Sequence, residues 1–271
     1  MNNKNTPLAI ITALVLLFGA PAVGQWLNSP TAGVPRLRDG KPNLTAPAPR
    51  TADGKPDFSG VWEAEQGPVT ADVAGGARIA PEFIDIAARL TGGLPYRPWA
   101  LDARRAREAN HGKDDPEGLC LPSSVIRMHS HPLPRKVLQL PGVIAILYEK
   151  NNEFRQIFTD GRRLPIDPEP AWRGYSSGTW RGDTLVVETR GFRDDLWADA
   201  NGNPLTESAN VTERFRRPNY GTLEIQVTVD DQKAYTAPWT VTIHQHIKLD
   251  TDLLEYVCLE NEQDRPHLVG K

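Results

Sequence analysis

The sequence predicts a mainly β protein in which an antiparallel meander closes into a lipocalin-like barrel. Between residues 136 and 260, stretches rich in Val, Ile, Thr and aromatic residues alternate with Gly and Asp, as strands alternate with turns. The connections are short and contain no helical pattern, which favours antiparallel pairing. A twisted sheet of about nine or ten strands tends to curl and close, because closure removes its exposed edges. A two-sheet β-sandwich is the alternative.

The first 24 residues have the order of a secretory signal peptide. Lys4 precedes an apolar stretch over residues 8–18, and small residues and prolines follow as far as Gly24. This stretch is too short to span a bilayer comfortably, and a retained helical anchor is the alternative. We therefore expect a periplasmic or secreted protein with no stable membrane insertion after cleavage.

Residues 25–57 are rich in proline and are predicted to be an extended arm, because they cannot bury enough apolar surface to fold alone. The arm contains a short echo, Asp-Gly-Lys-Pro at residues 39–42 and again at residues 53–56, which is too short to predict a structural repeat. Residues 58–271 are predicted to form a single β-rich domain, with a first strand over residues 58–64.

Two short helices are predicted near residues 80–110. Apolar residues recur at helical spacing over residues 80–90, with Pro81 at a favourable first position, and a second helix is expected over residues 98–110. An irregular, proline-bearing passage should follow over residues 121–135. The remaining strands are expected over residues 136–140, 143–150, 154–159, 175–181, 184–189, 211–216, 222–230, 239–249 and 253–260.

Glu213 is the leading candidate for a catalytic acid or base. The period of two places it with Val211 and Phe215 on the apolar face of its strand. A carboxylate in that position either forms a buried ion pair, for which Arg155 is a candidate partner, or keeps its proton with a raised pKa. Glu149 and Glu188 end apolar stretches in the same way and are further candidates for the wall of a pocket.

Two arginines are candidates for stabilising negative charge during catalysis. Arg155 and Arg162 lie on either side of the predicted turn at Asp160 and Gly161, although turn geometry alone explains that dipeptide. Tyr235 and Trp239 flank a proline turn and are candidates for ligand contact, with a place in the core as the alternative.

The only two cysteines, Cys120 and Cys258, are predicted to form a disulfide, because an even pair in an exported chain is usually oxidised. Such a bond would connect the start of the β region to its last strand. Two separate buried thiols are the alternative.

Four of the six histidines form two His-x-His pairs. Because residues two apart on a strand point the same way, adjacent pairs would present four imidazoles to one transition metal. The candidate ligands are His129, His131, His244 and His246, and titratable surface histidines are the alternative. No other cofactor is expected.

The formal net charge of -3 gives no basic surface for nucleic acid, and a small molecule is the expected partner. The chain also contains no nucleophile elbow, phosphate loop or dinucleotide fingerprint.

Several motifs resemble those of a large family of secreted bacterial proteins, abundant in acidobacteria and other soil bacteria, for which no activity is established. The specific segments are the hairpin Gly-Tyr-Ser-Ser-Gly-Thr-Trp-Arg-Gly-Asp-Thr-Leu-Val-Val at residues 174–187 and Thr-Glu-Arg-Phe at residues 212–215. Further segments are residues 113–122, 155–162, 228–239 and 253–261. The resemblance implies an exported β-rich domain. Members of this family often carry histidines where this chain has Asn203, Leu205 and Asn210, and the two His-x-His pairs are not typical of it.

The sequence therefore predicts an exported barrel that binds a small hydrophobic or aromatic molecule. As an enzyme it would be a cofactor-free lyase, isomerase or hydrolase, with Glu213 or Glu149 as acid or base and Arg155 or Arg162 stabilising developing negative charge. A non-catalytic binding module and an envelope-associated module are the alternatives.

Overall fold

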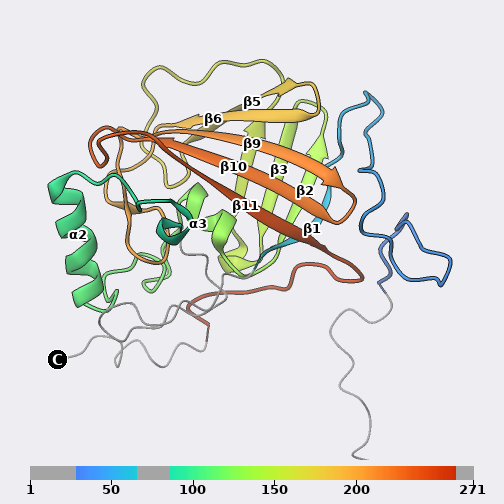
Figure 1. The fold of residues 1–271 in the computed structure, drawn as a ribbon, viewed down its shortest axis with the longest axis horizontal. Helices are drawn as coiled ribbons and strands as arrows, with labels where there is room; N and C mark the ends of the chain where they lie inside the picture. The colour runs from blue at the N-terminus through green and yellow to red at the C-terminus, as the bar shows by residue number, and fades with distance from the viewer. Residues whose placement is uncertain (1–28, 66–85, 261–271) are drawn as a thin grey trace, which may run out of the picture.

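A closed barrel of nine strands forms the centre of the computed structural model, which describes residues 29–65 and 86–260 (Figure 1). Around the barrel the order is β1 (Gly60–Ala64), β11 (Trp239–Lys248), β10 (Thr222–Asp230), β9 (Asn210–Asn219), β6 (Thr184–Arg190), β5 (Tyr175–Arg181), β4 (Phe154–Phe158), β3 (Val143–Tyr148) and β2 (Arg135–Leu140). The pairing of β2 with β1 closes the ring. The predicted mainly β barrel is thus confirmed. The predicted signal peptide and residues 80–85 of the first predicted helix lie outside the described residues.

One pair of neighbouring strands departs from the predicted antiparallel meander. β4 and β5 are parallel, with Ile157 opposite Ser176. A parallel pair needs a long crossover, and the connection over residues 159–174 supplies it. The sequence shows this connection only as a gap between two strand patterns.

The interior of the barrel is packed with side chains. Alternation along each strand turns Leu185, Phe215, Leu223 and their neighbours inward, where they are buried. The cavity that remains among them has a volume of about 10 Å³, at the lower limit for a single water molecule. The lumen of this barrel is therefore a core, as in other small barrels.

The longest helix of the described residues lies beside the barrel (Figure 1). α2 (Pro98–Ala109) confirms the second predicted helix, and Pro98 occupies its first turn. Within the range of the first predicted helix, the described residues contain the short 3₁₀ helix η1 (Ala87–Arg89). Among the described residues, no helix combines the length and apolar character needed to cross a membrane.

A third helix, α3 (Val125–Ser130), lies in the passage that was predicted to be irregular, so that prediction was wrong. All six of its residues are buried. Ser124 caps its first turn by accepting a hydrogen bond from the Arg127 backbone N–H, and its hydroxyl donates to the Trp197 carbonyl at 2.7 Å. A helix of less than two turns is too short to show a helical period in the sequence.

The prediction of a last strand over residues 253–260 was also wrong. These residues follow β11 without regular structure and end in a turn. The outer edge of β11 already pairs with β1, as in Trp62 opposite Ile247, so the closed ring has no edge for a further strand.

The arm contains a structural repeat, contrary to the expectation from its short echo. Each copy folds into the same turn, with isolated bridges between Arg36 and Pro42 and between Arg50 and Pro56. The arginine of each copy donates to the carbonyl of its own turn glycine, Gly40 or Gly54, at 2.8 and 2.7 Å. Both glycines have positive φ, which permits the repeated turn.

The second copy of this turn is attached to the barrel. Arg50 forms a bidentate ion pair with Asp183 in the β5–β6 hairpin turn, at 3.0 and 2.7 Å. Turn chemistry alone explains Gly182 and Asp183 in the sequence, and the structure adds that Asp183 holds the arm.

Candidate functional site

Glu213 is fully buried inside the barrel, where it is paired with Arg155. Alternation on β9 turns the carboxylate inward, and Arg155 points toward it from β4. Arg155 Nη1 donates to Oε1 at 2.8 Å, and Nη2 donates to Oε2. Nη2 also donates to the hydroxyl oxygens of Ser176 and Thr189, at 3.0 and 3.1 Å. Of the two outcomes expected for this carboxylate, the structure shows the buried ion pair.

α3 adds a third group to this pair. His129, on the last turn of α3, lies with its Nε2 2.5 Å from Glu213 Oε1. Arg135 at the start of β2 holds the end of the helix by donating to the carbonyls of Met128, His129 and His131, at 2.7, 3.1 and 2.8 Å. Sequence reasoning missed the link between residues 129 and 213, because no local signal connects them.

The charge states of this cluster follow from burial and from the neighbouring charges. Burial favours the neutral form of Glu213, but Arg155 and His129 hold the pKa of the carboxyl well below its usual range. Burial lowers the pKa of His129. At neutral pH Glu213 is therefore an anion and His129 is neutral, with its proton on Nε2 to match the carboxylate acceptor. A carboxyl with a lowered pKa is poorly suited to donate a proton at neutral pH.

The structure does not gather the other predicted catalytic residues around Glu213. Glu149 is buried and accepts a hydrogen bond from the backbone N–H of Leu254 at 3.0 Å. Glu188 is exposed on β6. Arg162 is exposed and pairs with Asp160 in its own turn, at 2.6 Å.

Tyr235 and Trp239 belong to the core. Both are buried, and their rings meet edge to face with centroids 5.7 Å apart. The Tyr235 hydroxyl donates to the Pro204 carbonyl at 2.7 Å. These contacts agree with the core alternative and show no ligand role.

The four candidate metal ligands do not come together in the structure. His129 contacts Glu213, His131 Nε2 lies 2.9 Å from Glu117, His244 Nδ1 lies 3.3 Å from Glu65, and His246 is exposed. In residues 29–65 and 86–260, no three His, Cys, Asp or Glu side chains are arranged to hold a metal ion.

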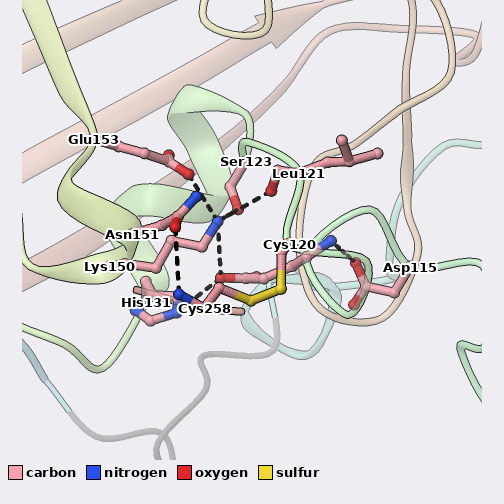
Figure 2. The surroundings of a disulfide bond; sticks show 10 residues. Asp115, Cys120, Leu121, Ser123, His131, Lys150, Asn151, Glu153 and Cys258 are labelled. Atoms are coloured by element: carbon pink, nitrogen blue, oxygen red, sulfur yellow. Dashed lines mark hydrogen bonds and ion pairs between the residues drawn. A yellow bond between two sulfur atoms is a disulfide. The ribbon is translucent and has the colours of Figure 1, made fainter. Parts of the chain in front are cut away.

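The predicted disulfide between Cys120 and Cys258 is confirmed, with Cα atoms 5.6 Å apart (Figure 2). It attaches the segment that follows β11, rather than a last strand, to the loop before α3. The backbone N–H of Cys258 also donates to Asn151 Oδ1 at 3.4 Å, in the 3₁₀ helix η2 (Lys150–Asn152). Beside the bond, the Lys150 ammonium donates to Leu121 O and Glu153 Oε1, at 3.1 and 3.0 Å (Figure 2).

A buried charge network surrounds Glu117 next to the disulfide. Glu117 contacts Arg127, His131 at 2.9 Å and Lys150 at 3.7 Å. Burial favours its neutral form, but these three groups lower its pKa to about 2. The network connects the loop before α3 to α3 and η2, and it is a structural feature of the fold.

Acid is expected to destabilise the fold in two steps. Burial holds the pKa values of His129 and His131 below 6.5, so the unfolded chain takes up more protons as the pH falls through about 6.5. The stability contributed by Glu117, about 3 kcal/mol, is present above its unfolded pKa of 4.5 and is lost as the pH falls toward about 2. Urea unfolding as a function of pH measures both steps.

The matched variants for this measurement are Glu117→Gln and the exposed Glu188→Gln. We expect Glu117→Gln to lower stability at neutral pH and to flatten the dependence below pH 4.5. Glu188→Gln should leave the curve unchanged. A Glu117→Gln curve parallel to that of the unmodified protein below pH 4.5 would contradict the assignment.

A cleft of about 380 Å³ lies outside the barrel wall. It lies where α2, which stands beside the barrel (Figure 1), meets the β10–β11 turn and the small sheet of β7 (Leu196–Trp197) and β8 (Pro204–Leu205). Its lining combines an indole, an aliphatic wall and four charged groups: Trp99, Arg107, Asp194, Asp195, Pro204, Leu205, Thr206 and Lys233.

Hydrogen bonds fix the walls of this cleft in place. The Trp99 indole N–H donates to the Lys233 carbonyl at 2.7 Å. Buried Asp231 accepts from both the backbone N–H and the hydroxyl of Thr206, each at 2.8 Å. Behind the wall, Asn203 Nδ2 donates to the buried Asp199 at 2.7 Å. The site is therefore preformed, as small-molecule sites usually are.

Two of the four charges in the cleft lack an ion-pair partner. Lys233 is held by Asp194 at 3.0 Å and by Glu207 at 2.8 Å. Arg107 donates to the Gly202 carbonyl at 2.8 Å and stacks over Trp197, 4.9 Å from the ring centroid. Within the described part of the chain, neither Arg107 nor Asp195 forms an ion pair. Burial lowers the pKa of Arg107, an effect that the nearby carboxylates Asp114 and Asp195 oppose.

Sequence reasoning missed this cleft. Its lining comes from α2, the turn before β7, β8 and the β10–β11 turn, which lie far apart along the chain. The available signal was the density of Asp, Asn and Gly over residues 194–203, which marks a loop of the kind that often carries function.

No family model matches this chain, and no curated protein matches it either. Its function is therefore inferred from the geometry of the barrel and the cleft.

Proposed function

We propose that this protein is an exported small-molecule-binding β-barrel protein whose ligand occupies the cleft beside α2 rather than the barrel lumen. The observation that carries the proposal is the contrast in volume, about 380 Å³ in the cleft and about 10 Å³ in the lumen. Ligand sites in proteins are typically about 300–1,000 Å³ in volume and combine apolar walls with a few polar groups.

Export is supported by two features. The first 24 residues have the order of a signal peptide, and the two cysteines form a disulfide, a bond that persists in oxidising compartments.

The chain departs at Asn203 and Leu205 from the exported family that it resembles. Asn203 lies behind the wall of the cleft, and Leu205 lies in it. This placement is consistent with a shared site whose chemistry has changed in this chain.

Binding is proposed in preference to acid/base catalysis at Glu213. The carboxylate is sealed among Arg155, His129 and the barrel core, and its lowered pKa keeps it ionised. A substrate would have no route to it without opening the barrel wall.

Ligand screening by two-dimensional NMR tests the proposal. We expect compounds with an apolar part and a charged group to shift the indole N–H signal of Trp99, and Trp99→Ala to weaken their binding about tenfold, the effect of removing a large contact area. Trp99 is 44% exposed, so the fold should tolerate this change.

The control is Phe154→Ala, which removes an exposed aromatic ring on β4, outside the cleft. It should leave ligand affinity unchanged. Hits that shift signals of the barrel core while leaving Trp99 unaffected would contradict the proposed site.

A further inference from the structure

We propose that the ligand of this cleft is a zwitterionic α-amino acid with an apolar side chain, an inference that rests on the proposed function and adds the ligand class. Lys233 is neutralised by Asp194 and Glu207. The cleft then offers one cation, Arg107, and one anion, Asp195, that form no ion pair with each other or with any other described residue. A lining with one charge of each sign complements a neutral ligand that carries both charges.

Arg107 is built to receive a carboxylate. Its position is fixed by the hydrogen bond to Gly202 O and by stacking on Trp197, so little side-chain entropy remains to be lost on binding. One hydrogen bond leaves most of its five N–H donors available. Because the group is half-buried, a ligand carboxylate would meet it in a medium that screens charge less than water does.

Asp195 is placed to receive the ammonium group. It has a φ of 63°, in the left-handed region that Asp and Asn adopt more readily than most residues. Asp195 is exposed, precedes β7 and lines the same cleft as Arg107. An α-amino acid, whose carboxylate and ammonium lie on one carbon, would bridge the two groups.

The remaining lining determines the side chain of the ligand. Trp99, which is 44% exposed, provides an aromatic face, and Pro204 and Leu205 lie buried in the wall behind the opening. An apolar side chain gains free energy by covering the indole, whereas a charged one would lose its hydration there.

Isothermal titration calorimetry of the purified, disulfide-bonded protein tests the inference with three matched probes. These are L-phenylalanine, N-acetyl-L-phenylalanine, which lacks the ammonium, and L-phenylalaninamide, which lacks the carboxylate. We expect each blocked probe to bind about 10- to 100-fold more weakly than phenylalanine, as for the loss of a charged hydrogen bond.

Two variants locate each charge. Asp195→Asn keeps the shape and the turn conformation of Asp195. It should lower the affinity for phenylalanine about tenfold or more and leave the affinity for N-acetyl-phenylalanine unchanged. Arg107→Gln should lower the affinity for phenylalanine and leave the affinity for phenylalaninamide unchanged. Asp102→Asn, on the exposed face of α2, is the control and should change nothing.

The outcomes separate this inference from the proposed function. Equal affinity for phenylalanine and its N-acetyl derivative would overturn the inference that the ligand is zwitterionic. The cleft would then remain a binding site for anions. If none of the three probes binds, the amino-acid class is wrong, and the effect of Trp99→Ala on the screening hits decides the proposed function separately. The unmodified protein should prefer phenylalanine to its N-acetyl derivative. If Asp195→Asn binds the two equally, the result would support both the zwitterionic ligand and the proposed site.

Discussion

Replacing Glu213 by Gln is expected to lower the free energy of unfolding by about 3–5 kcal/mol, as for other buried ion pairs that lose one partner. The change leaves the Arg155 guanidinium buried without a counter-charge, in a position where its hydrogen bonds to Ser176 and Thr189 cannot replace the ion pair. It also removes the anionic acceptor of the His129 Nε2–H. Urea or guanidinium unfolding at neutral pH measures the loss.

The matched control is Glu224→Gln on the neighbouring strand β10. Glu224 pairs with Arg216 at 3.3 Å on the barrel surface, where an ion pair contributes about 1 kcal/mol or less. Replacing both members of the buried pair, as in Glu213→Leu with Arg155→Met, should recover part of the loss because no unpaired charge remains. If Glu213→Gln and Glu224→Gln prove equally mild, the buried carboxylate does not stabilise the core.

Removing the disulfide is expected to cost about 2–5 kcal/mol. The bond joins residues separated by 138 positions, and in the chain-entropy model a long loop gives the larger stabilisation. The Cys120→Ser/Cys258→Ser double variant should unfold at a lower denaturant concentration. Amide hydrogen exchange at positions 254 and 258, whose N–H groups donate to Glu149 and Asn151, should accelerate in it.

Reduction provides an independent check on this prediction. Dithiothreitol should destabilise the unmodified protein to the level of the double variant and leave the double variant unchanged. Identical unfolding curves for the oxidised protein and the double variant would show that the remaining contacts of this segment suffice to hold it.

The barrel could be predicted from the sequence because each strand carries its own alternating pattern, as in Leu223, Ile225, Val227 and Val229 on β10. The inward position of Glu213 followed from the same period, whereas Arg155 was only one candidate partner until the structure showed the pair. α3 could not be predicted because its burial results from contacts with the barrel end, above all Arg135, and not from a helical period of its own.

The cleft required knowledge of the fold. No sequence pattern pairs Arg107 with another residue. Residues 107 and 195 are far apart along the chain, so the sequence does not show that they line one cleft.

The arm shows the opposite error. Its two copies of Asp-Gly-Lys-Pro are short, but the arginine before each turn also recurs, and the repeated unit includes it.

The closure of the barrel by β1 and β11 sets the order of events during biosynthesis. Val61, near the start of the described chain, pairs with Lys248, near its end. Until β11 has been synthesised, β1 and β10 are unpaired edges of the sheet, and the barrel cannot close. Such non-local closure is slow, because the entropy of joining distant segments is lost before their contacts form. The barrel of this chain is therefore completed only after β11 has been synthesised, whatever the order in which the other strands pair.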